Sequence, residues 1–584
     1  MEPTTIPIAF QVLLFLSLGV AFILGATWTI TNLRFYAHLR KLANGEDKDP
    51  STEPLALPYA VPWVGNALGF LNEQASFWAN MKKTLGPNHQ LCTTRLGPAK
   101  CYIITGGQNI QAMFKMSRHL SSDQLERQIM KSVFHLPDRD IDTILQPAHD
   151  DKGKVTDMGK KNRMYDVEKI YENFLLTPHA VNSLTTKFLD VFGEVLDQAP
   201  EIPPLPEANS REAEWATVNF YEWFKDHMFT ASTTAFLGSR VLEMNPDLAK
   251  DFWIFEENFL NLVYGLPRFL ARSGNEARDR LLNSASRWLD DAHNHGDIEN
   301  TEDWDPYFGS RFVREREKMD QKMGLGTKSK AGVRIGLLFG ISSNAIPATG
   351  WMLLHILASP THILPRILSE VQSCLLPNDD NNNTTTLSIS IPDLLNPTRT
   401  PLLHSLYTET LRHYHALNLS RDVKSRCTID GHLLLPGNMV MAPSWMMHRN
   451  EDLWTDPPPD VFYPERFLAT DEKSGEVTFS TAKTGGGRYF PYGGGAHICP
   501  GRVFAKQEIL AAVARTLLGF EFGLVDWVET GTERVVGKKG VDGRGFPGHK
   551  KGYVGLGVMV MEWDARVKVR RRRVGTGGEG LVKS

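Results

Sequence analysis

The segment RYFPYGGGAHICPGRVF, residues 488–504, combines three consecutive glycines, a histidine two places before a cysteine and a proline directly after that cysteine. The chain has five cysteines, which are Cys92, Cys101, Cys374, Cys427 and Cys499, and no two of them form a C-x-x-C pair. This spacing is typical of neither a zinc site nor a disulfide framework. We therefore predict a chemical role for Cys499 and buried structural roles for the other four.

The residues around Cys499 predict how its thiol is presented. Pro500 suits the first position of a helix, and the amphipathic segment 501–520 continues that helix until Gly519 ends it. Cys499 would then stand at a helix N-terminus, where free N–H groups and the helix dipole favour a thiolate over a thiol. Because Gly493–Gly495 carry no side chains, a large flat ligand can approach the backbone closely.

The stretch YGGGAHICPG, residues 492–501, closely resembles the heme-binding loop of the cytochrome P-450 heme-thiolate monooxygenases, F-x-x-G-x-[RH]-x-C-x-G. Gly495, His497, Cys499 and Gly501 match this pattern, and Tyr492 replaces the usual Phe. The resemblance implies that Cys499 is the axial ligand of a heme b iron, whose anionic sulfur favours O–O cleavage. It also implies that His497 contacts a heme propionate.

Other elements follow in the order that this family has. In LYTETLRHYHA, Glu409 and Arg412 are three residues apart and share one face of a helix. The later segment VFYPERF resembles the family's P-E-R-F element, so Arg466 can complete a buried cluster with that pair, which needs a third partner for its remaining hydrogen bonds. Arg421 fits the family's propionate-binding arginine. The resemblance covers nearly the whole chain after Gly65.

The segment GLLFGISSNAIPATGW takes the place of the oxygen-activating helix, usually [AG]-G-x-[DE]-T-T. Gly340 fits its first position, but Ser343 stands where the acid is expected and Asn344 where the threonine is expected. Pro347 cannot donate to the carbonyl of Ser343, so the helix should kink there and leave a polar groove. The stretch resembles the branch that contains sterol 7α- and 12α-hydroxylases and prostacyclin synthase.

The N-terminal segment predicts a membrane anchor. The chain has 584 residues, and none between Glu2 and Arg34 is charged. Residues 8–30 would form a helix about 35 Å long, against a hydrocarbon core of roughly 30 Å. Basic residues follow this segment instead of preceding it, which favours an uncleaved anchor over a signal peptide. By the positive-inside rule, the catalytic part then faces the cytosol, as expected of a single-pass protein of the endoplasmic reticulum.

The remainder of the chain predicts a mainly α fold with a small β part. We expect a membrane anchor over residues 1–33, a basic and proline-rich linker over 34–66, a heme-thiolate catalytic domain over 67–565 and a basic tail over 566–584. A net charge of −3 makes nucleic acid an unexpected partner. The run from Arg566 to Arg573 is interpreted as a solvated tail, with an anionic membrane surface as the alternative.

The resemblance implies a monooxygenase that hydroxylates a lipophilic polycyclic substrate, sterol or terpenoid in type, with O2 and electrons from an NADPH-dependent flavoprotein reductase. Asn344, Ser343 and an ordered water would have to deliver the protons. Two alternatives stay open. One is a heme-thiolate isomerase or dehydratase, which rearranges a peroxide without O2 or a reductase. The other is a heme-binding sensor or carrier.

Overall fold

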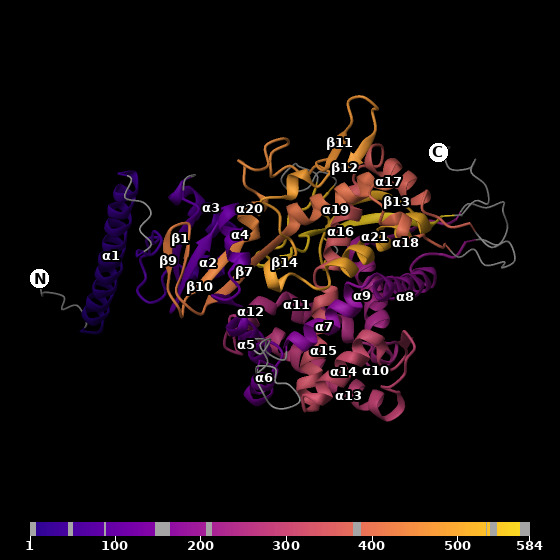
Figure 1. Cartoon of the computed structure of the whole chain (residues 1–584), viewed down its shortest axis with the longest axis horizontal. Helices are drawn as coiled ribbons and strands as arrows, with labels where there is room; N and C mark the ends of the chain where they lie inside the picture. The colour runs from indigo at the N-terminus through magenta and orange to yellow at the C-terminus, as the bar shows by residue number, and fades with distance from the viewer. Residues whose placement is uncertain are drawn as a thin grey trace, which may run out of the picture. The chain divides into compact units, whose positions relative to one another are not determined.

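The computed structural model describes residues 8–44, 51–86, 89–145, 164–205, 213–377, 387–532, 534–537 and 546–572. The chain forms two compact units (Figure 1). Unit 1 comprises Met1–Leu125, Ala416–Leu453 and Thr484–His497. Unit 2 comprises Glu126–His415, Trp454–Lys483 and Ile498–Ser584. The chain therefore passes from unit 1 into unit 2 inside the glycine-rich loop, between His497 and Ile498.

Unit 1 is built on a sheet in which β1, β2, β10 and β7 lie in this order, with β3 added to β7. Strands β1 and β2 are antiparallel, β10 runs parallel to β2, and β10 and β7 are antiparallel. Apolar residues of these strands and of α4 form one buried cluster that includes Tyr102, Ile110 and Val440. The strands of unit 1 are β1 (Leu91–Leu96), β2 (Ala99–Ile104), β3 (Leu120–Ser121), β7 (His415–Val423), β8 (Cys427–Ile429), β9 (His432–Leu434) and β10 (Met439–Pro443). Its helices are α1 (Ile8–Ala43), α2 (Ala67–Asn72), α3 (Gln74–Leu85), α4 (Gly107–Lys115), α20 (Ser444–His448) and the 3-10 turn η2 (Gly495–His497).

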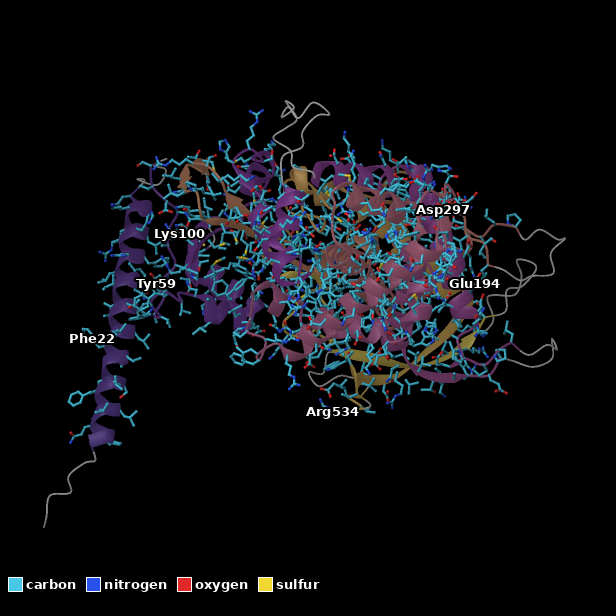
Figure 2. All side chains as sticks on the ribbon, turned by 90° about the horizontal axis from the view of Figure 1, so that it is seen from below. Phe22, Tyr59, Lys100, Glu194, Asp297 and Arg534 are labelled. Atoms are coloured by element: carbon cyan, nitrogen blue, oxygen red, sulfur yellow. The ribbon has the colours of Figure 1, made fainter. Side chains whose placement is uncertain are left out.

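Helix α1 is the predicted anchor, and it runs on to Ala43, past the expected boundary at residue 33. Among the described residues, two stretches are long and apolar enough to cross a membrane: Phe10–Lys41, whose apolar window has no buried residue, and Thr327–Leu357, whose window is 78% buried. The ring of Phe22 projects from α1 away from other side chains (Figure 2). The first ten residues of the expected 34–66 linker are therefore helical.

Unit 2 holds most of the helices. They are α5 (Asp123–Ser132, with its first turn in unit 1), α6 (Asp138–Leu145), α7 (Met164–Leu175), α8 (Pro178–Asp197), α9 (Phe220–Leu237), α10 (Arg240–Met244), α11 (Leu248–Glu257), α12 (Phe259–Val263), α13 (Arg272–His295), α14 (Arg311–Lys322), α15 (Thr327–Ser342), α16 (Ala345–Leu357), α17 (Ile363–Gln372), α18 (Ile391–Leu394), α19 (Pro401–Tyr414) and α21 (Arg502–Gly519). The 3-10 turn η1 (Ala482–Thr484) stands at its border with unit 1. Its strands are β4 (Ala216–Asn219), β5 (Trp304–Asp305), β6 (Gly309–Ser310), β11 (Leu468–Thr470), β12 (Val477–Phe479), β13 (Phe520–Glu529), β14 (Leu556–Val558) and β15 (Trp563–Arg571).

The centre of unit 2 is formed by α16, which packs against α9, α19 and α21. Nearly every residue of α16 is buried, as expected for a helix that is apolar on all sides. The ring of Trp351 stacks on that of Tyr414 with centroids 3.7 Å apart, which joins α16 to the end of α19. The prediction of a mainly α fold with a small β part is confirmed.

The basic run at residues 566–573 is folded as far as the structure describes it, so its interpretation as a solvated tail is wrong for Arg566–Arg571. These residues belong to β15, which pairs with both β13 and β4. The side chain of Arg570 pairs with Glu521 at 2.8 Å. Arg571 donates to backbone carbonyls, including that of Leu196 at 3.1 Å. Valines at 567 and 569 are fully buried between these cations, so the run is an alternating strand.

Candidate functional site

Cys499 is half-buried, whereas the other four cysteines are buried. Helix α21 begins at Arg502 with Gly501 as its N-cap, so Pro500 precedes the helix instead of occupying its first position. Arg502 folds back and donates from Nη1 to the carbonyl of Cys499 at 2.9 Å. A Cβ atom on Gly501 would lie 3.8 Å from Cys499 Sγ, an ordinary van der Waals contact, so Gly501 lies directly beside the sulfur.

Burial raises the pKa of the Cys499 thiol, and the backbone N–H groups of Gly501 and Arg502 act against it. This rise in the pKa is opposite to the fall expected from a helix N-terminus alone. The cost of desolvating a thiolate outweighs the stabilisation that the two N–H groups provide. A bound metal ion reverses this balance, since a coordinating thiol loses its proton.

The glycines before Cys499 allow a close approach of the backbone to Phe114, which belongs to α4. A Cβ atom on Gly494 would lie 2.5 Å from Cδ2 of Phe114, and one on Gly495 would lie 2.5 Å from its carbonyl oxygen. Gly495 also has φ +69°, in the left-handed region that favours glycine. The glycine run therefore packs closely against α4 within unit 1.

His497 and Arg421, the two residues expected at heme propionates, are close enough in unit 1 to affect each other. Burial and then the positive charge of Arg421 lower the pKa of His497. Arg421 lies in β7, 8% exposed, and donates from Nη1 to the carbonyl of Ser420 at 2.8 Å. Ser122 Oγ lies 3.3 Å from His497 Nδ1. No sequence pattern marks Ser122, which is 375 positions from His497.

Glu409, Arg412 and Arg466 lie together in unit 2. Arg412 donates to both carboxylate oxygens of Glu409, at 2.7 and 2.8 Å. Arg466 Nε lies 3.0 Å from Oε2 of the same carboxylate, and the backbone N–H of Tyr463 donates to Oε1 at 2.9 Å. All three charged side chains are buried. The cluster attaches the segment that contains Tyr463 and Arg466 to α19, which is a structural role.

The long apolar helix breaks at Ser343 and Asn344. Helix α15 ends at Ser342, and α16 begins at Ala345 with Asn344 as its N-cap. The predicted kink is therefore present, three residues before Pro347. Ser343 is buried and accepts a hydrogen bond from Asn344 Nδ2 at 3.2 Å. Asn344 Oδ1 accepts from the backbone N–H of Val558, in β14, at 2.8 Å.

The residues present fit a heme iron better than a bare metal ion. Within the described ranges, no group of three or more His, Cys, Asp or Glu side chains could hold a metal ion. Cys499 can therefore supply one sulfur ligand to a metal that brings its other ligands with it, as the iron of a heme does. Within unit 1, Arg421 near His497 is a cationic side chain of the kind that pairs with anionic groups.

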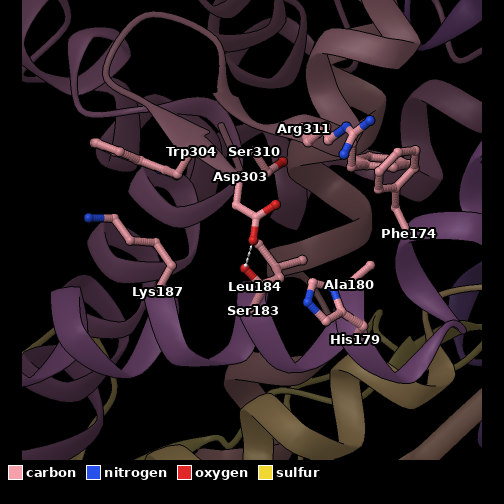
Figure 3. Close-up of a pocket in the computed structure, with 11 residues that line it drawn as sticks. Phe174, His179, Ala180, Ser183, Leu184, Lys187, Asp303, Trp304, Ser310 and Arg311 are labelled. Atoms are coloured by element: carbon pink, nitrogen blue, oxygen red, sulfur yellow. Dashed lines mark hydrogen bonds between the residues drawn. The ribbon is translucent and has the colours of Figure 1, made fainter. Parts of the chain in front are cut away.

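A surface hollow of about 100 Å³ in unit 2 is separate from the residues predicted for the site, none of which lines it (Figure 3). At its centre Ser183 Oγ donates to Asp303 Oδ2 at 2.6 Å. Lys187 Nζ lies 3.9 Å from the ring centroid of Trp304. The hydroxyl of Ser183 and the carboxylate of Asp303 are therefore already bonded to each other.

Three comparisons with known proteins give a consistent result. The profile of the family described as "Cytochrome P450" matches residues 205–533. The "Cytochrome P450 monooxygenase calL" of Penicillium decumbens is 29% identical over 502 residues, which cover 84% of this chain and 88% of that protein. The "Cholesterol 7-alpha-monooxygenase" of Cricetulus griseus is 27% identical over 337 residues, or 56% of this chain and 63% of that protein.

Among solved structures, "Retinoic acid bound cyanobacterial CYP120A1" superposes with a TM-score of 0.58 at 17% identity, covering 89% of this chain and 100% of that one. This likeness concerns the fold. Since the family profile extends over more than half of the sequence, the chain belongs to the cytochrome P450 family.

Proposed function

We propose that this protein is a membrane-anchored heme-thiolate monooxygenase that hydroxylates a lipophilic polycyclic substrate, sterol- or terpenoid-like, with O2 and electrons from an NADPH-dependent flavoprotein reductase. The observation that carries the proposal is the half-buried Cys499 in its glycine-rich loop, ahead of α21. The surroundings of Cys499 suit a sulfur atom that binds a heme iron. The relatives that match most of the chain are named monooxygenases.

The cofactor of this proposal is heme b, held by Cys499 at the iron and by Arg421 and His497 at the propionates. Gly495 and Gly501 leave space for the ring and the sulfur. A heme bound through a thiolate supplies O2 activation and the transfer of one oxygen atom to the substrate. The protein's own residues then have to bind the substrate, exclude water and move protons.

Ser343 and Asn344 are the residues proposed to handle protons. They replace the acid and the threonine that the family usually has at these places. Ser343 has a hydroxyl that can both accept and donate, and Asn344 already donates to it. The break between α15 and α16 leaves these two side chains outside regular helix, next to the backbone of β14.

The sterol- or terpenoid-like substrate class rests on the resemblance of the SSNAIPATGW stretch and on the relative named for cholesterol. The proposed membrane location rests on α1, whose apolar window has no buried residue. Because Arg34, Arg40 and Lys41 follow the apolar segment, the proposal includes a catalytic part that faces the cytosol from the membrane of the endoplasmic reticulum.

The first test concerns the iron ligand. The reduced carbon monoxide complex of the wild type should show the absorption band of a thiolate-ligated heme, and Cys499→Ser should abolish it. Cys427→Ser, which alters a buried cysteine, is the control and should retain the band. A folded Cys499→Ser protein that keeps the band would overturn the assignment.

The second test concerns the reaction. With reductase, NADPH and O2, a screen of sterols and terpenoids should give hydroxylated products. Anaerobic turnover of a peroxide substrate without reductase, together with no oxygenation under aerobic conditions, would instead show an isomerase or dehydratase.

A further inference from the structure

The side chain of Asn344 is fixed in one orientation by strand β14. The backbone N–H of Val558 donates to Asn344 Oδ1 at 2.8 Å. Since a backbone N–H can only donate, the amide must turn its oxygen toward the strand. Its nitrogen then faces Ser343, and Nδ2 donates to Ser343 Oγ at 3.2 Å. The amide therefore presents an N–H donor, not an oxygen, on the side of Ser343.

The sequence at the start of α16 explains why the side chain of Asn344 can bond to β14. Asn344 is the N-cap of α16, yet its side chain makes no capping hydrogen bond. An N-cap asparagine normally accepts from the N–H of the second or third helical residue. The third helical residue here is Pro347, which has no N–H. One of the two local partners is thus missing, and the side chain bonds to β14 instead.

Gly557 makes the contact with β14 possible. A Cβ atom on Gly557 would overlap Asn344 Oδ1 and lie 3.1 Å from Asn344 Cγ. The strand cannot easily withdraw, because the next residues are also held. Met559 accepts at its carbonyl from Trp351 Nε1 at 2.7 Å and donates from its N–H to the carbonyl of Tyr414 at 2.9 Å. A side chain at 557 would therefore displace Asn344 before it displaced the strand.

We propose that Gly557 and the backbone of Val558 are positioning residues that lock the Asn344 amide with its N–H toward Ser343. In this arrangement Ser343 Oγ accepts from Asn344, and the hydroxyl hydrogen of Ser343 remains available to donate onward. Asn344 orients the hydroxyl, and Ser343 passes its proton onward and takes a replacement from an ordered water through its remaining lone pair. The lock itself is independent of the chemistry, whereas its role in proton delivery rests on the proposed function.

The test is a double-variant cycle on the heme-loaded full-length protein, read by thermal unfolding. Gly557→Ala should lower Tm, because the new methyl group displaces Asn344. In an Asn344→Ala background the part of that loss caused by the overlap should disappear, whereas the strain of a non-glycine residue at φ +157° remains in both backgrounds. Gly523→Ala is the matched control: Gly523 lies in β13, and a Cβ atom there meets nothing within 4 Å. Gly523→Ala should change Tm equally in both backgrounds.

The role of the lock is read from coupling, the share of NADPH electrons recovered in hydroxylated product instead of hydrogen peroxide. Gly557→Ala, Asn344→Ala and the double variant should all lose coupling to the same level, a drop of about tenfold or more. Gly523→Ala should keep wild-type coupling. If Gly557→Ala fails to fold while the double variant folds, this result supports the overlap with Asn344 more strongly than a difference in Tm would.

Two results would overturn the proposal: an equal Tm loss from Gly557→Ala in both backgrounds, or wild-type coupling in Gly557→Ala. If the wild type shows no NADPH-dependent oxygenation at all, the proposed function fails. The Tm cycle still shows whether Gly557 and Val558 hold the Asn344 amide in place. Failure of the proposed function and failure of this positioning can therefore be told apart.

Discussion

Arg466 Nε donates to both carboxylate oxygens of Glu409, at 3.1 and 3.0 Å, although the two residues are 57 positions apart. Arg412 occupies the other side of the same carboxylate from Glu409's own helix. The remaining N–H groups of Arg466 donate to backbone carbonyls, among them that of Val461 at 2.7 Å. A buried carboxylate with two guanidinium partners stabilises the fold only while the set is complete.

We expect Arg412→Ala to give little heme-loaded protein. Removal of one guanidinium leaves buried charge without its partner, at a cost of about 3–5 kcal/mol. The yield of the carbon monoxide band and the Tm measure this loss. Arg272→Ala is the control, because it breaks an exposed pair with Glu276 and should leave both values unchanged. An Arg412→Ala protein that loads heme fully and merely turns over slowly would contradict a structural role.

Gly494→Ala should reduce heme loading. The new Cβ atom would lie 2.5 Å from Cδ2 and 2.6 Å from Cζ of Phe114, whose ring also contacts Phe490 edge-on at 6.0 Å. Since the ring is confined, the loop must shift, at a cost of about 1–3 kcal/mol. Gly485→Ala is the control, because a Cβ atom there meets nothing within 4 Å. Equal heme occupancy in both variants would show that the contact with Phe114 does not set the loop.

Stability should fall as the pH rises from about 5 to about 8, in part through Glu508. Burial raises the pKa of Glu508 from 4.5 to about 8, and its Oε1 accepts from Ser232 Oγ at 2.5 Å. The folded state therefore holds a proton that the unfolded state releases at lower pH. The contribution is complete below the unfolded pKa and is lost as the pH rises through the folded one.

Glu508→Gln should flatten this dependence of Tm on pH, because a neutral amide has no proton to lose. Some slope should remain, since burial also raises the pKa values of Glu256 and Asp564 to about 7. Glu472→Gln, at an exposed position, should reproduce the wild-type curve. Parallel curves for the wild type and Glu508→Gln between pH 5 and 8.5 would refute the prediction.

A protein lacking residues 1–50 should bind heme with the same spectrum and lose its carbonate-resistant association with membranes. Most large apolar side chains of helix α1 between Phe10 and Leu33 are exposed. Arg570→Gln should leave the association of the full chain unchanged, because Arg570 is paired with Glu521 in the sheet. Undiminished membrane association of the shortened protein would show that another surface performs the anchoring.

Ser343→Ala should increase hydrogen peroxide release and lower product yield, because it removes the hydroxyl that accepts from Asn344. Its neighbour gives the control. Ser342 is also buried, and its Oγ contacts no hydrogen-bond partner among the described residues. Ser342→Ala should therefore keep the wild-type ratio of product to peroxide. The same ratio in both variants would remove Ser343 from proton delivery.

Local patterns were enough to predict the anchor helix, the break at Ser343, the ion pair of Glu409 with Arg412 and the position of Cys499 in a glycine-rich loop ahead of a helix. Each depends on residues within a few positions of one another. The alternation of Val567 and Val569 with basic residues was also a local signal, and it indicates a strand. The basic residues of the run favoured its interpretation as a solvated tail, because charged residues are usually solvated.

The sequence by itself determined the family and the fold class, and it predicted the residues that would bear the chemistry. The tertiary structure decided which partners those residues have: Phe114 against Gly494, Ser122 beside His497, and Val558 bonded to Asn344. These partners are backbone groups or ordinary side chains, with no pattern that marks them. Since a backbone N–H is the same at every residue, only the folded chain can select the one at Val558.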